Sequence, residues 1–231
     1  HWYNILSLDV NRSSPVIAVF GNSITDGRGT TTNAQNRWTD YMGIELGQGT
    51  QEYALNDGGN HAAAIPTGII NMGIGGNCVL EGGISTPLIK RYKDELSFHS
   101  GISHIIIYEG TNDIGTSNLE PSLLALRLIE AYKEIITYAH SKGIKVFMAT
   151  ITPTKGNNWY SPSHEKARQQ VNEWIRKCEG FEGVIDFDKL VRDPSDSEKL
   201  KAEYSDDWLH LNPRGYEVMG RYAAKIITNN L

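Results

Sequence analysis

Short apolar runs alternate along the chain with longer segments in which apolar residues recur every three or four positions. The apolar runs predict strands that are buried on both faces, and the longer segments predict amphipathic helices between them. We expect strands at residues 16–20, 69–72, 105–108, 146–151 and 184–187, and helices at residues 37–46, 86–96, 163–178 and 213–228. This alternation predicts a parallel sheet with helices on both faces.

The clearest helical pattern begins at Glu120-Pro121, where proline in the first turn loses no hydrogen bond, and ends at Lys142-Gly143. Residues 47–66 are rich in Gly, Asn and Ala and lack periodicity, so we expect an irregular surface segment there. Residues 1–14 carry aromatic side chains but no motif, and they are interpreted as a strap across the domain or the remnant of an upstream region. Because no repeat or linker interrupts the pattern, residues 1–231 are predicted to form a single domain.

The composition fits that prediction: 231 residues with 39% hydrophobic and 21% charged residues suit one packed globular domain. A formal net charge of -5 argues against nucleic acid or an anionic membrane as a partner. No apolar run approaches the ~20 residues that span a bilayer. The chain begins at His1 without an initiator methionine or a signal peptide, so we expect a processed or truncated product and favour a secreted or periplasmic location. The sequence does not indicate an oligomeric state.

Cys78 and Cys178 are the only cysteines, and they do not form a metal-ligand spacing. Two buried free thiols are the expected arrangement, with a disulfide left open as the alternative. No metal is expected.

Polar segments follow each of the first three predicted strands. Ser23 lies in the segment 21–27, Gly76 in the glycine-rich segment 71–77, and Asn112 in Gly110-Thr111-Asn112-Asp113. Because ligands bind beyond the carboxyl ends of parallel strands, we expect these three residues to gather at one edge of the sheet. A serine held rigidly at such an edge is suited to nucleophilic catalysis.

A serine hydroxyl needs a general base, and His210 is the best candidate because Asp207 precedes it by three residues. That spacing lets the carboxylate orient one imidazole nitrogen and leaves the other free to accept the serine proton. The alternative is a surface Asp–His pair that caps the last helix. The competing histidines lack a carboxylate at this spacing before an Asn-Pro turn; they are His61, His99, His104, His140 and His164.

Ester hydrolysis also needs preorganised donors for the oxyanion of the tetrahedral intermediate. Asn112 can supply a side-chain amide, and the glycines of segment 71–77 let backbone N–H groups approach a ligand. An ordinary Asx turn and simple turn geometry are the respective alternatives. Neither glycine-rich segment has the spacing of a dinucleotide fingerprint or a phosphate loop, and the serine is not in a Gly-x-Ser-x-Gly elbow.

From residue 16 to residue 222 the joint order of these motifs resembles the SGNH (GDSL-like) hydrolase family. In that resemblance Ser23 is the nucleophile, His210 the base and Asp207 its orienting carboxylate, while the oxyanion hole consists of Ser23 N–H, Gly76 and Asn112. The resemblance implies a flavodoxin-like three-layer α/β/α sandwich with a central five-stranded parallel sheet. It also implies hydrolysis of carboxylic esters through an acyl-enzyme, with no metal and no cofactor.

The chain departs from the family pattern at Asn22, where the family usually has an aspartate before the serine. Asparagine keeps a carbonyl acceptor and removes a negative charge beside the nucleophile. We therefore expect the local turn to persist and the rate or pH profile to change. Gly73 and Gly75 lie close enough to Gly76 to compete with it as the donor.

The substrate is indicated by fewer residues. Trp159 and Tyr160 follow the fourth predicted strand, and Trp208 lies between the proposed aspartate and histidine. Exposed aromatic rings at the rim of a site offer sugars a flat apolar face, with ordinary packing as the alternative. We expect a short-acyl, acetyl-type esterase acting on a carbohydrate or similar polar ester. The alternatives are a lysophospholipase, lipase or thioesterase of the same family, or a catalytically silent glycan-binding module.

Overall fold

Five parallel strands form one sheet with the order β2-β1-β3-β4-β5. The computed structural model describes residues 14–56, 67–177 and 179–230, without the side chains of residues 48–56. The strands are β1 (Val16–Gly21), β2 (Gly68–Gly73), β3 (Ile102–Tyr108), β4 (Lys145–Ala149) and β5 (Gly183–Ile185). The order reverses between β1 and β3, so the carboxyl ends of these two strands border the crevice in which ligands of such sheets bind.

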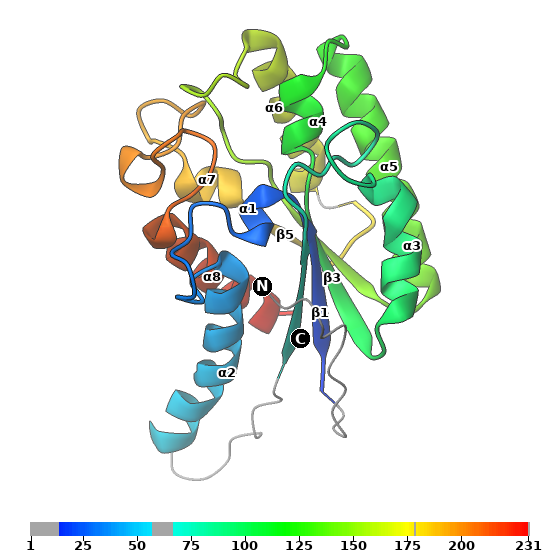
Figure 1. Ribbon diagram of the computed structural model, residues 1–231. Coiled ribbons are helices and arrows are strands. Elements are labelled where there is room, and N and C mark those ends of the chain that lie inside the picture. The colour runs from blue at the N-terminus through cyan, green and yellow to red at the C-terminus, as the bar shows by residue number, and fades with distance from the viewer. Residues whose placement is uncertain (1–13, 57–66, 178, 231) are drawn as a thin grey trace.

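Helices cover both faces of the sheet (Figure 1). One layer contains α3 (Leu88–Phe98), α5 (Pro121–Ser141) and α6 (Pro162–Lys177). The other contains α1 (Ser23–Asp26), α2 (Trp38–Asn56), α7 (Phe187–Val191) and α8 (Pro213–Thr228). The short α4 (Thr111–Thr116) and the 3-10 helix η1 (Ala202–Tyr204) lie in the connections. The prediction of a three-layer α/β/α sandwich around a five-stranded parallel sheet is confirmed.

Two hydrophobic cores, one on each face, hold the layers together. Along β1, Ala18 and Phe20 face the layer of α3, α5 and α6, whereas Ile17 and Val19 face the layer of α2 and α8. All four side chains are fully buried, because alternate residues of a strand point to opposite faces and both faces are covered. This explains why the strands are continuous apolar runs in the sequence.

Two predicted strands end earlier than expected. Strand β4 ends at Ala149 rather than at residue 151, because the backbone N–H of Ile151 donates to the side chain of Asn172 instead of to a neighbouring strand. Strand β5 ends at Ile185 rather than at residue 187, because Asp186 caps α7 by accepting a hydrogen bond from the N–H of Lys189. In both places a side-chain oxygen accepts the hydrogen bond of a backbone N–H. The apolar content of a segment does not predict such a side-chain acceptor.

The prediction of an irregular segment from residue 47 is wrong for its first part, since α2 continues through Asn56. Glycine in a helix interior costs about 1 kcal/mol relative to alanine. Gly47 and Gly49 therefore weaken the helix without removing any backbone donor, and no proline occurs between Pro15 and Pro66. The remainder of that segment (57–66) and the predicted N-terminal strap (1–13) lie outside the described residues.

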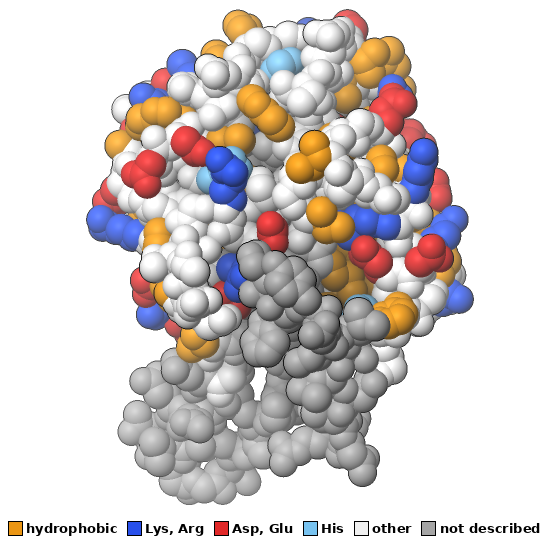
Figure 2. Space-filling model, viewed as in Figure 1, with side chains coloured by type: hydrophobic (Ala, Val, Ile, Leu, Met, Phe, Trp, Pro, Cys, Tyr) orange, Lys and Arg blue, Asp and Glu red, His pale blue; other side chains and the backbone are white. Residues whose placement is uncertain are grey.

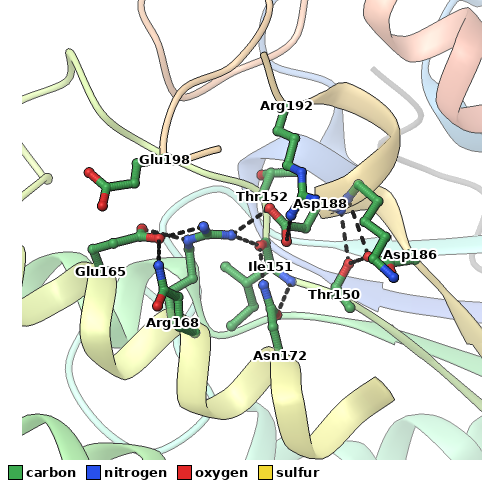
Figure 3. A network of polar contacts seen from close by, with 12 residues as sticks. Thr150, Ile151, Thr152, Glu165, Arg168, Asn172, Asp186, Asp188, Arg192 and Glu198 are labelled. Carbon is green, nitrogen blue, oxygen red and sulfur yellow. Dashed lines mark hydrogen bonds and ion pairs between the residues drawn. The ribbon is translucent and has the colours of Figure 1, made fainter. Parts of the chain in front are cut away.

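A buried ion pair joins α6 to α7, and buried hydrogen bonds join α6 to the segment after β4 (Figure 3). The Arg168 side chain is only 4% exposed and contacts the Glu165 carboxylate at 2.7 Å and the Asp188 carboxylate at 2.8 Å. It also donates to the backbone oxygen of Ile151 at 2.8 Å. The carboxamide of Asn172 closes the arrangement by bonding to both the N–H and the C=O of Ile151. Because buried charges are tolerated only when paired and hydrogen-bonded, these groups fix the three segments relative to one another.

Candidate active site

Ser23 is the first residue of α1, directly beyond the carboxyl end of β1. Asn22 caps this short helix, with its side-chain oxygen accepting the N–H of Ile24 at 3.0 Å. The amide nitrogen of Asn22 is buried and has no hydrogen-bond partner among the described residues. The carbonyl oxygen that asparagine shares with aspartate is thus the atom that forms the turn, and the turn presents Ser23 at the edge of the sheet.

His210 and Asp207 approach Ser23 from the segment that precedes α8. The Oγ of Ser23 lies 2.9 Å from Nε2 of His210, and Nδ1 of His210 lies 2.7 Å from an Asp207 carboxylate oxygen. When Nδ1–H donates to Asp207, Nε2 is left as the acceptor for the serine hydroxyl. The sheet therefore brings together three side chains whose sequence positions span 187 residues between Ser23 and His210.

The second carboxylate oxygen of Asp207 accepts the backbone N–H groups of Leu209 at 3.0 Å and His210 at 2.8 Å. Partial burial of Asp207 opposes its ionisation, but the hydrogen bonds from His210 and Leu209 outweigh it and hold the pKa of this carboxyl below its usual value. Asp207 is therefore a carboxylate at neutral pH. In that state it orients the imidazole and stabilises its protonated form.

Ser205 closes the turn that carries Asp207 and His210, a role that the sequence analysis missed. Its hydroxyl donates to the backbone oxygen of His210 at 2.7 Å and accepts the N–H of Trp208 at 2.9 Å. Trp208 has a φ of 63°, a left-handed conformation that bulky residues rarely adopt. The buried Ser205 hydroxyl thus holds a strained turn in place. The only sign of this turn-closing role in the sequence is the presence of a serine two residues before Asp207.

We predict that Ser205→Ala lowers kcat for p-nitrophenyl acetate about tenfold and leaves KM within about twofold, because a relaxed turn misplaces His210 without removing a substrate contact. Steady-state kinetics of the variant measure both constants. Ser195→Ala is the matched control, since Ser195 is exposed and its hydroxyl bonds only locally to Asp193. A variant with reduced thermal stability but unchanged kcat would limit Ser205 to a structural role.

Asn112 lies in the first turn of α4, beyond the carboxyl end of β3. Its amide nitrogen donates to the backbone oxygen of Asn77 at 2.6 Å, which uses one of its two hydrogens. This bond joins the end of β3 to the loop that follows β2, which contains Gly76. The second amide hydrogen is the one that Asn112 can offer to a ligand.

Asp113 strengthens the same junction. Its carboxylate accepts the N–H groups of Val79 at 2.8 Å and Leu80 at 2.9 Å. Burial raises the pKa of Asp113 to about 6, while these two backbone donors act in the opposite direction. The loop that carries Gly76 is thus fastened to α4 by both Asn112 and Asp113, and only the first of these was predicted as a site residue.

Gly76 has a φ of +70°, and a Cβ atom added there would lie 2.5 Å from Cγ1 of Ile84. The backbone conformation therefore favours glycine, and any other residue would also have to displace the Ile84 side chain. For Gly73, a Cβ would lie 2.4 Å from the backbone N of Asp26, and for Gly75 a Cβ would meet only Asp26 at 3.6 Å. Gly76 is the one of the three that combines a left-handed backbone with a neighbouring side chain.

The three aromatic residues predicted at the rim all have packing partners. The Trp159 ring lies against Gly115 of α4, where a Cβ would be 2.1 Å from the indole. The Tyr160 hydroxyl donates to Glu198 at 2.6 Å, and the Lys199 ammonium lies 4.0 Å from the centre of the Trp208 ring. Each of the three rings remains partly exposed.

The competing histidines bond elsewhere, as far as the structure describes them. His164 contacts the backbone oxygens of Trp159 at 2.7 Å and Ser117 at 3.0 Å. His140 contacts Glu182, and burial lowers the pKa of His104 at the amino end of the sheet. His61 lies outside the described residues, and so does Cys178. The buried thiol of Cys78 has its pKa raised to about 12 by burial, with Asp113 and Glu109 adding to the effect.

No group of three or more His, Cys, Asp or Glu side chains within residues 14–56, 67–177 and 179–230 is arranged to hold a metal ion. Among the helices in those ranges, none has the length and apolar character needed to cross a membrane.

A serine, a histidine and an aspartate at the carboxyl edge of a five-stranded parallel sheet are the arrangement of an α/β hydrolytic enzyme. Residues 19–218 match the GDSL-like Lipase/Acylhydrolase family, so the chain belongs to this family and is a carboxylic ester hydrolase. The resemblance to the SGNH (GDSL-like) hydrolases is thereby confirmed. No curated protein matches the sequence.

Solved structures with the same fold share little sequence with the chain. A carbohydrate acetylesterase from Sinorhizobium meliloti has a TM-score of 0.67 at 16% identity, covering 94% of this chain and 100% of that one. An aryl esterase from M. smegmatis has a TM-score of 0.66 at 17% identity, with coverage of 94% and 100%. A GDSL-like lipase from Bacteroides thetaiotaomicron has a TM-score of 0.65 at 18% identity, with coverage of 98% and 93%. At these identities the similarity shows the shared fold.

Proposed function

We propose that the chain is a serine esterase that cleaves short-acyl, acetyl-type esters of carbohydrates through an acyl-enzyme. Ser23 is the nucleophile, His210 the general base and Asp207 the carboxylate that orients it. The observation that carries this assignment is the continuous path of contacts from Ser23 Oγ to His210 Nε2 at 2.9 Å and from His210 Nδ1 to Asp207 at 2.7 Å. The same contacts argue against a catalytically silent glycan-binding module.

In the first half of the reaction Ser23 Oγ attacks the ester carbonyl carbon while His210 Nε2 takes the hydroxyl proton. The negative charge that develops on the carbonyl oxygen is stabilised by the N–H groups of Ser23 and Gly76 and by the free amide hydrogen of Asn112. His210 then gives its proton to the departing alcohol oxygen. Water then enters on the same side and attacks the acyl carbon while His210 takes one of its protons. The bond between the acyl carbon and Ser23 Oγ breaks, His210 returns the proton to that oxygen, and the acid leaves.

The proposal of a carbohydrate substrate is based on the aromatic residues expected at the rim of the active site. The partly exposed rings of Trp159, Tyr160 and Trp208 provide flat apolar surface beside polar groups. On the face of the molecule drawn in Figure 2, hydrophobic side chains of the described residues are scattered among charged and polar ones, which favours a polar ester over a lipid surface. The similarity in fold to a carbohydrate acetylesterase supports the same class.

Release of acetate from acetylated polysaccharides, compared with acyl release from phospholipids and acyl-thioesters, tests the substrate class. The Ser23→Ala protein serves as the blank in each arm. Acetate release that depends on Ser23 is the expected result. Fatty acid release from phospholipids, or thioester cleavage, at a much higher rate than acetate release would replace this proposal by a lysophospholipase or a thioesterase.

Acyl-chain dependence gives a further prediction. The kcat/KM for p-nitrophenyl esters is expected to fall from C2 and C4 toward C8 and longer chains by at least tenfold, because no long apolar segment is available as a lid or an acyl tunnel. Initial rates on a C2 to C12 series measure this dependence. A maximum at C8 or longer would contradict the polar-ester assignment and support a lipase.

A further inference from the structure

Ile84 is the most exposed large hydrophobic side chain among the described residues, at 86% exposure, although it contacts the loop proposed to bind the oxyanion. It lies between β2 and α3, and its Cγ1 occupies the space next to Gly76 where a side chain would otherwise project. The Ile84 N–H donates to the Gly76 backbone oxygen at 3.3 Å. Gly83 has a φ of +71° and packs against the same oxygen. Ile84 is therefore held at Gly76 while most of its side chain faces solvent.

The reaction geometry decides which part of an ester would meet this side chain. The tetrahedral carbon carries Ser23 Oγ, the oxyanion, the leaving alcohol oxygen and the acyl group. The oxyanion must face Gly76 and Asn112, and the alcohol oxygen must face His210 to receive its proton. The acyl group takes the remaining direction, away from His210.

Ile84 and His210 belong to opposite layers of the sandwich. His210 lies two residues before Asn212, the cap of α8, in the layer of α2, α7 and α8. The loop of Ile84 leads into α3, and its Glu81 forms an ion pair with Arg127 of α5 at 2.9 Å. The loop of Ile84 and the segment of His210 thus connect to elements on opposite faces of the sheet, so the direction away from His210 leads toward the layer whose connecting loop carries Ile84.

We propose that Ile84 is a specificity-determining residue that contacts the acyl group of the substrate. This inference rests on the proposed esterase function and extends it to the acyl side. The acyl carbons next to the carbonyl pack against the exposed Ile84 side chain, which covers them on one side only. A one-sided apolar contact increases the binding free energy of acyl groups with two to four carbons and adds little for longer chains.

The test compares kcat/KM for p-nitrophenyl butyrate and p-nitrophenyl acetate in the wild type and in Ile84→Ala. Each buried methylene is worth about fourfold in binding. We expect the butyrate-to-acetate ratio to fall about threefold to tenfold in Ile84→Ala and to recover in Ile84→Leu, which restores the apolar reach. Phe98→Ala is the control, because Phe98 is also exposed but lies at the far end of α3; its ratio should not change.

A second series varies the alcohol, with p-nitrophenyl acetate and ethyl acetate as the pair. The ratio within this pair should be the same in the wild type and in Ile84→Ala. An unchanged butyrate-to-acetate ratio, or a change confined to the alcohol series, would overturn the proposal while Ser23-dependent hydrolysis persists. If the wild type and Ser23→Ala instead hydrolysed these esters at similar rates, the esterase mechanism would be overturned, and this inference with it.

Discussion

Ser23→Ala is expected to lower kcat for p-nitrophenyl acetate by about 10⁴-fold to 10⁶-fold, because the variant lacks the atom that attacks the carbonyl carbon. The remaining rate over the uncatalysed reaction would come from substrate binding and from the donors around Gly76 and Asn112. A stopped or continuous p-nitrophenol assay measures the loss. Circular dichroism and thermal unfolding should match the wild type, since a half-exposed hydroxyl contributes little to folding.

His210→Ala should cause a loss of kcat of the same order, because the serine hydroxyl then has no base. Asp207→Ala should cost less, since Asp207 orients the imidazole without transferring a proton. His140→Ala is the matched control, because its exposed imidazole contacts only Glu182. Near wild-type turnover in Ser23→Ala or His210→Ala would refute the mechanism. A large loss in His164→Ala or His61→Ala, with His210→Ala active, would assign the base to a different histidine.

Arg168→Met is expected to lower the free energy of unfolding by about 3–5 kcal/mol, because it leaves Glu165 and Asp188 as buried carboxylates with fewer partners. Both side chains are about as buried as Arg168 itself, at 5% and 3% exposure. Methionine retains much of the apolar volume, so the loss of charge is the main effect. Urea or guanidinium unfolding monitored by circular dichroism measures the change.

Lys133→Met is the control for this prediction, since the Lys133–Glu130 pair is more than half exposed on both sides. Exposed pairs of this kind contribute about 0–1 kcal/mol. A destabilisation of Arg168→Met no larger than that of Lys133→Met would show that the buried network adds little to stability. The role of the network would then be limited to positioning α6 and α7 relative to each other.

Much of the fold could be predicted from local patterns. The five apolar runs gave the five strands of the sheet, and the helix at 213–228 has the predicted bounds. The errors occur where a polar side chain replaces a backbone partner, as Asn172 does for Ile151 and Asp186 does at the start of α7. The prediction for residues 47–56 is wrong because Gly47 and Gly49 weaken a helix without ending it, and no proline interrupts α2.

The sequence by itself determined the order of the strands along the chain, the residue types at their carboxyl ends and the family to which they belong, because periodicity and short motifs are local properties. Only the tertiary structure decided that Ser23 and His210 meet at 2.9 Å, that Ser205 and Asp113 fasten the two segments beside them, and that Ile84 lies against Gly76. These contacts join residues from separate elements, and their distances depend on how the layers pack on the sheet. No local pattern along the chain contains that information.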